Sequence, residues 1–299
     1  MNRSSASNGE HQGTCGTLYV VSTPIGNMED ITLRALNILK TVDVIAAESV
    51  THTKGLCDRH GITTRRISYN QHNQTSRTHK ILRWLKSGQH VALVTNAGTP
   101  GISDPGAYLI HRVASEQIPV TPIPGPSAVI SALSVSGMPS EQFVFLGFPP
   151  NKPAKRKKAL SGLVSEPRTM VFFEAPHRIR ATLLDMAEVL GNRHIVVLRE
   201  MTKTFEDVVR GSIRSVLENL TADRVRGEFT LVVAGKKAGE KPILTEAVRR
   251  RMDTLFREKY GSVRDIAKLI SKEEGIAYRR VYRECLSRKR DDINIDGTG

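Results

Sequence analysis

Short apolar runs alternate with amphipathic segments through the first 125 residues of the chain. The runs predict buried β-strands at 18–21, 42–47, 90–94 and 118–120. Apolar residues at helical spacing between them predict helices over 31–39, 79–86 and 107–115, the first with Asp30 as its N-cap. Strands that alternate with helices imply a largely parallel sheet with helices on its faces.

The pattern changes after about residue 140. Strands are predicted at 143–148, 170–173, 195–198 and 229–234, and one clear helix at 178–190. Hairpin-like spacing around 205–211 indicates some antiparallel pairing, so the second sheet is expected to be mixed. The fold class we predict is α/β, with a parallel-sheet N-terminal domain and a mixed-sheet second domain.

A polar linker at 236–242 separates these sheets from a C-terminal segment of short helices. The helices are predicted at 244–257, 262–273 and 276–287, and the break at 274–277 has the rhythm of a helix-turn-helix. The predicted organisation is a disordered tail at 1–16, α/β domains at 17–126 and 127–238, and a small helical domain at 243–290.

The net charge of the chain indicates what kind of partner it binds. The net charge is +14 and the sequence pI is about 9.9, which favours an anionic partner, most often nucleic acid. A basic protein without an anionic ligand is the alternative. Three widely spaced cysteines argue against a disulfide framework and against a zinc site, and fit a reducing cytoplasm. No apolar run reaches membrane-spanning length, and the N-terminus does not have the pattern of a secretory signal.

Several loops follow apolar runs and are expected to gather at one edge of the sheets. They lie at 23–27, 48–53, 96–106, 122–127, 174–178 and 199–203. The loop after the strand at 90–94 is rich in glycine and proline, which suits either a tight turn or the wall of a binding site. The dinucleotide fingerprint, the P-loop, the zinc-protease motif and the nucleophile elbow are all absent from the sequence.

Five segments together carry a resemblance to a known family. YVVSTPIGNMEDITLRAL, NAGTPGISDPG, PIPGPSAV, FEAPHR and REMTKTFE resemble the ribosomal small-subunit RNA ribose 2′-O-methyltransferase I family of the tetrapyrrole-methylase superfamily, from about Thr17 to Gly235. The resemblance implies two α/β domains with S-adenosylmethionine in the cleft between them, and a homodimer. It implies a cytidine in the decoding region of 16S rRNA, in the 30S subunit, as the substrate.

The resemblance also implies which residues would contact the cofactor. These are Pro24, Asn96, Gly98, Gly101, Ile102, Ser103, Ser127, Phe173 and Thr230. Two segments depart from the family pattern. Asn96 stands where the family usually has Asp, and Ser49-Val50-Thr51 stands where it has Asp-Thr-Arg. The first departure removes a charge that would face the cofactor, and the second removes an acid and an arginine.

Transfer of a sulfonium methyl group to a ribose oxygen needs no metal, because the methyl group is already activated. It needs alignment of the reacting atoms and a base for the 2′-hydroxyl proton. The candidate bases at strand ends are Glu48, Glu174, His177 and Glu200, which the sequence does not rank. For Glu174 and Glu200 the alternative is an ion pair, with Arg178 and with Lys203 or Arg199 respectively.

Two basic segments are candidates for RNA contact. One comprises Lys152, Lys155, Arg156, Lys157, Lys158 and Arg178, and the other comprises Arg279, Arg280, Arg283, Arg288, Lys289 and Arg290. A methylase of the same fold that acts on a porphyrin-type small molecule is one rival function. A non-catalytic RNA-binding ribosome-assembly factor is the other, and it would not require the cofactor.

Overall fold

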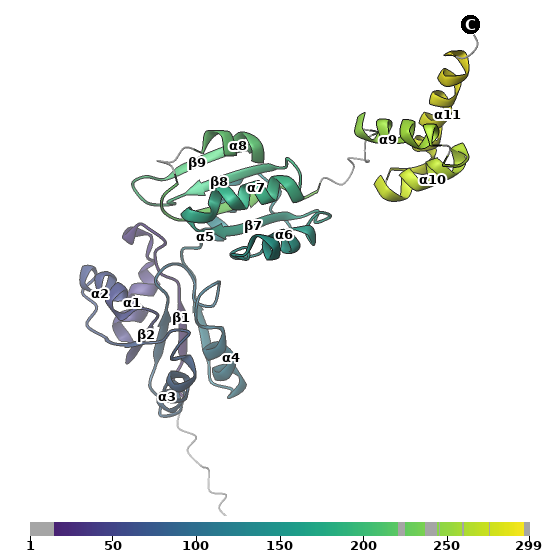
Figure 1. Ribbon diagram of the computed structural model, residues 1–299. Coiled ribbons are helices and arrows are strands. Elements are labelled where there is room, and N and C mark those ends of the chain that lie inside the picture. The colour runs from purple at the N-terminus through teal and green to yellow at the C-terminus, as the bar shows by residue number, and fades with distance from the viewer. Residues whose placement is uncertain are drawn as a thin grey trace, which may run out of the picture. The chain divides into compact units, whose positions relative to one another are not determined.

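The computed structural model describes residues 15–220, 225–236, 244, 246–258, 260–274 and 276–295. The chain forms two compact units, Met1–Lys236 and Lys237–Gly299, and the first contains both sheets (Figure 1). Residues 1–14 of the predicted tail lie outside the described residues. Gly16 is buried and its N–H donates to the Leu85 carbonyl (2.7 Å), so the packed chain begins before Thr17.

The first sheet is entirely parallel, as the alternating pattern predicts. Its strands are β1 (Leu18–Val21), β2 (Val44–Ala47), β3 (Arg65–Ser68), β4 (Val91–Val94) and β5 (Val120–Ile123), in the order β3-β2-β4-β1-β5. All their carboxyl ends therefore lie at one edge, which is where α/β proteins bind ligands.

Helices cover both faces of this sheet. They are α1 (Leu33–Thr41), α2 (Val50–Arg59), α3 (Gln74–Lys86) and α4 (Ala107–Ser115), with a short 3-10 helix η1 (Met28–Asp30) before α1. Ile45 and Ala47 of β2 pack with α1 and α2, whereas Val44 and Ala46 pack with α3 and α4. A strand buried on both faces in this way is a continuous apolar run in sequence, which is the signal that predicted it.

The second sheet is mixed. Its strands are β6 (Phe143–Phe145), β7 (Thr169–Glu174), β8 (His194–Arg199), β9 (Asp207–Ser212) and β10 (Phe229–Val233), in the order β6-β7-β10-β8-β9. Only β6 and β7 run parallel, and the predicted antiparallel pairing at 205–211 is the β8–β9 pair. One face is covered by α5 (Ala128–Ser136). The other is covered by α6 (Pro153–Ser161), α7 (Ile179–Val189) and α8 (Ile213–Asn219), with the 3-10 helix η2 (Pro176–Arg178) before α7.

Three helices are described in the C-terminal unit, where two or three short helices were predicted. They are α9 (Glu246–Arg257), α10 (Val263–Glu274) and α11 (Tyr278–Ile295). Their buried core includes Met252, Ile266, Ile270, Val281 and Cys285. Among the described helices, none combines the length and the apolar character needed to span a bilayer.

Two local predictions were wrong because the helix N-caps lie at other residues than expected. Thr32, not Asp30, caps α1, because Thr32 Oγ1 accepts from the Ala35 N–H (3.1 Å) while Asp30 ends η1. Residues 50–53, expected in a loop, form the first turn of α2, whose Ser49 cap accepts from the His52 N–H (3.3 Å). Ser and Asp are both favoured N-caps, so the serine at 49 is as suited to this position as the acid of the family pattern.

Candidate active site

Two loops at the carboxyl ends of neighbouring strands are joined by backbone hydrogen bonds. Thr23 after β1 and Gly98 after β4 exchange N–H···O bonds of 2.9 and 3.0 Å. Thr23 Oγ1 also donates to the Thr95 carbonyl (3.0 Å). Gly98 has a φ of 75°, a backbone conformation that glycine adopts without strain. The two Gly- and Pro-containing motifs thus form one continuous wall.

This wall also contacts the loop that joins β8 to β9. The Asn27 N–H donates to Thr202 Oγ1 (2.9 Å), across 175 residues of sequence. A Cβ on Gly26 would lie 2.6 Å from Thr202 Oγ1 and 2.8 Å from the Met201 carbonyl oxygen. Because carbon atoms do not approach so closely, only glycine permits this contact. The TPIGN and REMTKTFE motifs therefore meet in space.

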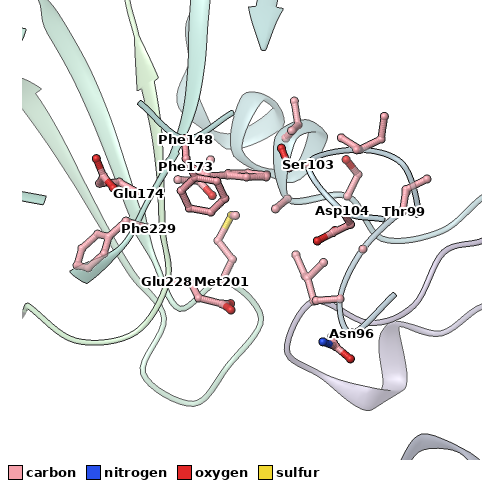
Figure 2. A pocket seen from close by; sticks show the side chains of 18 of the residues that line it. Asn96, Thr99, Ser103, Asp104, Phe148, Phe173, Glu174, Met201, Glu228 and Phe229 are labelled. Atoms are coloured by element: carbon pink, nitrogen blue, oxygen red, sulfur yellow. The ribbon is translucent and has the colours of Figure 1, made fainter. Parts of the chain in front are cut away.

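A cavity of about 440 Å³ lies between the two sets of loops. Figure 2 shows Asn96, Thr99, Ser103 and Asp104 on one side of it, facing Phe148, Phe173, Met201 and Glu228 on the other. Its remaining lining residues are Ile25, Glu48, Ala97, Gly98, Ile102, Ser127, Ala128, Val129, Glu174, Ala175, Pro176, Phe229 and Thr230. The residues thus come from the ends of strands in both sheets and from the start of α5, where Ser127 is the N-cap.

Four carboxylates line the cavity, and no Lys, Arg or His is among its described lining residues. Glu48 Oε2 accepts from the Asn96 N–H (3.0 Å), and Glu228 Oε2 accepts from Lys203 Nζ (3.1 Å). Asp104 forms no hydrogen bond or ion pair with any described residue. Burial, together with the charges of Glu48 and Glu228, raises the pKa of Asp104 to about 6. The cavity is therefore suited to a ligand that carries positive charge.

The fourth carboxylate, Glu174 at the end of β7, is saturated with partners. Its side chain is 0% exposed and lies 3.0 Å from Arg178 Nε. Thr182 Oγ1 (2.5 Å) and the Ala175 N–H (2.8 Å) donate to it. Arg178 in turn donates to the Pro149 carbonyl. The FEAPHR motif thus contains a buried ion pair, Glu174–Arg178, beside the cavity. This agrees with the alternative interpretation of Glu174 as an ion-pair partner of Arg178.

Aromatic rings form the opposite side. Phe148 and Phe173 stand edge to face at 5.6 Å, and Phe145 packs on Phe173 at 4.9 Å. Phe148 is 54% exposed, so its ring is available to a planar ligand. Asn96 supplies a polar counterpart, because its Oδ1 is buried and has no partner within the described chain. A buried acceptor without a donor is costly unless a ligand supplies one.

The structure brings together most of the residues predicted to contact the cofactor. Seven of the nine line the cavity: Asn96, Gly98, Ile102, Ser103, Ser127, Phe173 and Thr230. Pro24 is buried and Gly101 lies in the turn before α4, and neither lines the cavity. Gly101 has a φ of 83°, which gives it a role in the turn itself. Their predicted cofactor contacts remain predictions.

The four candidate bases differ in whether they line the cavity. Glu48 and Glu174 line the cavity, whereas His177 and Glu200 do not. His177 is exposed on η2. Glu200 accepts from Lys203 Nζ (2.8 Å) and from the Glu228 N–H (2.9 Å). Burial opposes ionisation of Glu200, but these donors outweigh it and hold the pKa of that carboxyl below its usual range.

The first basic segment is less available than its sequence suggests. Lys152, Lys155 and Lys158 are exposed on or beside α6, but Arg156 is 3% exposed and its Nε donates to Asp185 (2.7 Å). Lys157 pairs with Glu188 (2.7 Å). Arg156 was therefore wrongly expected to face RNA, because helical spacing turns it toward α7 while its neighbours point outward. Arg178 is likewise committed to Glu174.

The C-terminal basic residues differ in the same way. Arg279, Arg280 and Arg283 are exposed on α11, and none has an ion pair within the described chain. Arg288 pairs with Asp253. The side chains of Lys289 and Arg290 lie outside the described residues.

Sequence reasoning did not name every lining residue, and among those it missed are Thr99, Asp104, Phe148, Met201 and Glu228. Asp104 had a signal, because it is the acid that closes the NAGTPGISDPG segment. Phe148 also had one, since it ends an aromatic-rich run. Glu228 lies just before β10 and is brought to the cavity by pairing with β8 and β7, which no local pattern shows.

Comparison with known proteins agrees with this geometry. Residues 17–217 match the family model described as Tetrapyrrole (Corrin/Porphyrin) Methylases. A Bacillus subtilis (strain 168) protein named ribosomal RNA small subunit methyltransferase I is 47% identical over 75% of this chain and 77% of its own. A protein of the same name from Synechocystis is 42% identical over 92% of this chain and 99% of its own.

A solved structure shares the fold. The uroporphyrin-III C-methyl transferase from Thermus thermophilus, complexed with S-adenyl homocysteine, aligns with a TM-score of 0.52 and 18% identity. The alignment covers 79% of this chain and all of that one. The two chains therefore share the two-sheet fold.

Proposed function

The chain belongs to the tetrapyrrole methylase family, together with relatives named ribosomal RNA small subunit methyltransferase I, and from this membership we propose its reaction. It is an S-adenosylmethionine-dependent rRNA methyltransferase. We propose that the acceptor is the ribose 2′-oxygen of a cytidine in the decoding region of 16S rRNA. We also propose that the enzyme acts on the 30S subunit as a cytoplasmic homodimer.

The residues of the cavity fit the cofactor. When bound, S-adenosylmethionine supplies an activated methyl group on a positively charged sulfur. Its ammonium and sulfonium charges suit a cavity lined by carboxylates and free of cationic side chains among the described lining residues. The phenyl rings of Phe148 and Phe173 suit adenine, and the orphaned Asn96 Oδ1 suits a donor. The volume of about 440 Å³ is within the usual range for such ligands.

Asp104 is the carboxylate we propose as the base. Glu48 accepts a backbone N–H, Glu174 is enclosed by its partners, and Glu228 pairs with Lys203, so each already has a local role. Asp104 alone among the lining carboxylates has no such partner in the described chain. A base with a pKa near 6 is mostly ionised at neutral pH and still accepts a proton readily.

The observation that carries the proposal is the acidic, cation-free lining of the cavity. The test is transfer of labelled methyl groups to 30S subunits that lack the modification, followed by digestion of the rRNA to nucleosides. Recovery of 2′-O-methylcytidine supports the proposal. A label recovered only on a base, or only on a porphyrin, refutes it.

Asn96→Asp is expected to bind S-adenosylmethionine more tightly than the native chain. A charged acceptor in place of the orphaned amide oxygen strengthens a hydrogen bond to a cationic group by about 1–2 kcal/mol. Calorimetric titration measures the change, with Asn27→Asp as the control because Asn27 does not line the cavity. Unchanged or weaker binding by Asn96→Asp would show that residue 96 does not face the cofactor's charge. A native chain without any affinity would favour the assembly-factor alternative.

Arg283→Gln is expected to flatten the salt dependence of 30S binding. If Arg283 on α11 contacts a phosphate, its loss reduces the slope of log K against log salt by about 0.7. Arg251→Gln is the matched control, because Arg251 is already paired with Glu273 at 2.9 Å. The affinity for 30S subunits is measured from about 50 to 300 mM salt, a range over which phosphate contacts weaken strongly. Equal slopes for both variants would remove Arg283 from the RNA contact surface.

A further inference from the structure

A second hollow adjoins the cofactor cavity. It is more open, has a volume of about 490 Å³, and is lined by residues that include Gln71, His72, Gln74 and Tyr108. Asp104 lines both hollows. The carboxylate thus stands where a group held in the outer hollow would meet a group held in the inner cavity. We call the outer hollow the α3 groove, because Gln74 is the first residue of α3.

The chemistry of the α3 groove suits a nucleotide. The side chains of Gln71 and Gln74 each present both a donor and an acceptor, which are the groups that read the edge of an unpaired base. Tyr108 is 38% exposed, and an exposed aromatic ring beside such amides offers a surface for stacking. In contrast to the inner cavity, this groove has no ring of carboxylates.

The chain leading from the groove is strongly cationic. Residues 59–103 contain seven Lys or Arg and no Asp or Glu. Five of these lie on β3 and α3 and form no ion pair with any described residue. Arg66 donates to the Ile62 and Thr64 carbonyls, and the other four are Arg65, Arg77, Lys80 and Arg83. We call them the α3 strip. The other cations of this segment are paired, Lys86 with Glu116 (2.9 Å) and Arg59 with Glu29 (3.6 Å), so the α3 strip holds positive charge that no described acid neutralises.

Trp84 lies within the α3 strip. The Arg65 guanidinium lies 5.5 Å and the Lys80 ammonium 5.1 Å from the centre of its ring. A half-buried indole with cations over it combines stacking with charge, as surfaces that bind single-stranded nucleic acid do. From Gln74 to Trp84 the helix rises about 15 Å. This length matches about four nucleotides at stacked spacing.

We propose that the acceptor strand of the RNA lies along α3, with the target nucleotide in the α3 groove beside Asp104 and the neighbouring phosphates on the α3 strip. The proposal rests on the proposed function and names the surface that delivers its substrate. In the reaction the 2′-oxygen forms a bond to the methyl carbon and the leaving sulfur keeps the electron pair of the broken bond. The hydroxyl proton passes to the Asp104 carboxylate, so atoms and charges balance.

Binding rather than turnover tests the α3 strip. The double variant Arg77→Glu/Lys80→Glu is compared with Arg34→Glu/Lys40→Glu, which makes the same charge change on α1. Arg34 and Lys40 are exposed, and α1 covers the opposite face of the sheet. Affinity for unmodified 30S subunits is measured with S-adenosylhomocysteine present, so that no methylation occurs, and circular dichroism confirms that both variants are folded. We expect roughly tenfold weaker binding for the α3 variant only, because two phosphate contacts are lost.

Tyr108 tests the groove independently. Tyr108→Phe keeps the ring and should bind 30S subunits as the native chain does, whereas Tyr108→Ala should bind roughly tenfold more weakly. Equal binding by the two charge variants, or by Tyr108→Phe and Tyr108→Ala, overturns the proposal. Failure of the proposed function has another signature: native protein that binds 30S subunits through α3 but transfers no methyl group to them.

Discussion

Asp104→Asn is expected to lower kcat/KM for methyl transfer by about 10²–10⁴, which is the usual contribution of a positioned general base. Asparagine has nearly the same shape as aspartate but does not accept the proton. Binding of S-adenosylmethionine should persist, because Glu48 and Glu228 still line the cavity. Single-turnover transfer to 30S subunits and calorimetric titration of the cofactor separate the two effects. A variant with full activity would exclude Asp104 as the base.

The pH dependence of kcat/KM provides a second test of Asp104 as the base. With the pKa of Asp104 at about 6, kcat/KM of the native enzyme should rise with pH up to about 6 and then level off. Burial raises this pKa most, and the charges of Glu48 and Glu228 raise it further; His72 and Tyr108 line the α3 groove together with Asp104. Glu228→Gln should therefore move the rise to lower pH. Asp104→Asn should abolish it. A rise that stays in place in Glu228→Gln would assign it to another group.

The contribution of Asp104 to stability should fall as the pH rises, whereas its contribution to activity should increase. The pKa of Asp104 is raised from 3.8 in the unfolded chain to about 6, so the folded state binds the proton more tightly. The contribution of Asp104 to stability is present below pH 3.8 and is lost as pH rises through about 6. Asp104→Asn should therefore raise the free energy of unfolding more at pH 7.5 than at pH 4, two values that lie roughly on either side of that window. Urea unfolding of the variant and the native chain at both pH values measures the difference.

Arg178→Met is expected to destabilise the protein by about 3–5 kcal/mol, the second large effect. Its loss leaves Glu174, with 0% of its side chain exposed, as a buried charge without its cationic partner. The double variant Glu174→Gln/Arg178→Met should recover much of the loss, since no charge then remains buried. Urea unfolding measures all three proteins.

Lys155→Met is the matched control for this series. Lys155 is exposed on α6, so its loss should change the free energy of unfolding by no more than about 0.5 kcal/mol. The comparison also decides the role of Arg178. A stable Arg178→Met with weakened 30S binding would restore the RNA contact that the sequence predicted. An unstable one, with binding intact when folded, establishes the ion pair as structural.

Short-range patterns account for the parts of the fold that were predicted. β2 and β4 are continuous apolar runs, and α4 repeats its apolar residues at Leu109 and Val113. α2 and α5 were missed for opposite reasons. α2 carries few apolar residues, and α5 (AVISALSVS) is so uniformly apolar and small that it shows little periodicity. α6 was hidden by its run of basic residues, since only Arg156 and Leu160 on it are buried.

By itself the sequence determined most of the strands, several of the helices, the position of loops at strand ends, and the methylase family. These follow from spacing along the chain and from motifs whose residues are close neighbours. Only the tertiary structure decided which charged groups are available. Arg156 is neutralised by Asp185, 29 residues away, and Glu48 is occupied by the Asn96 N–H, 48 residues away. Ionisation and access depend on such distant partners and on burial, so Asp104 became distinguishable from the other acids only after folding had paired them.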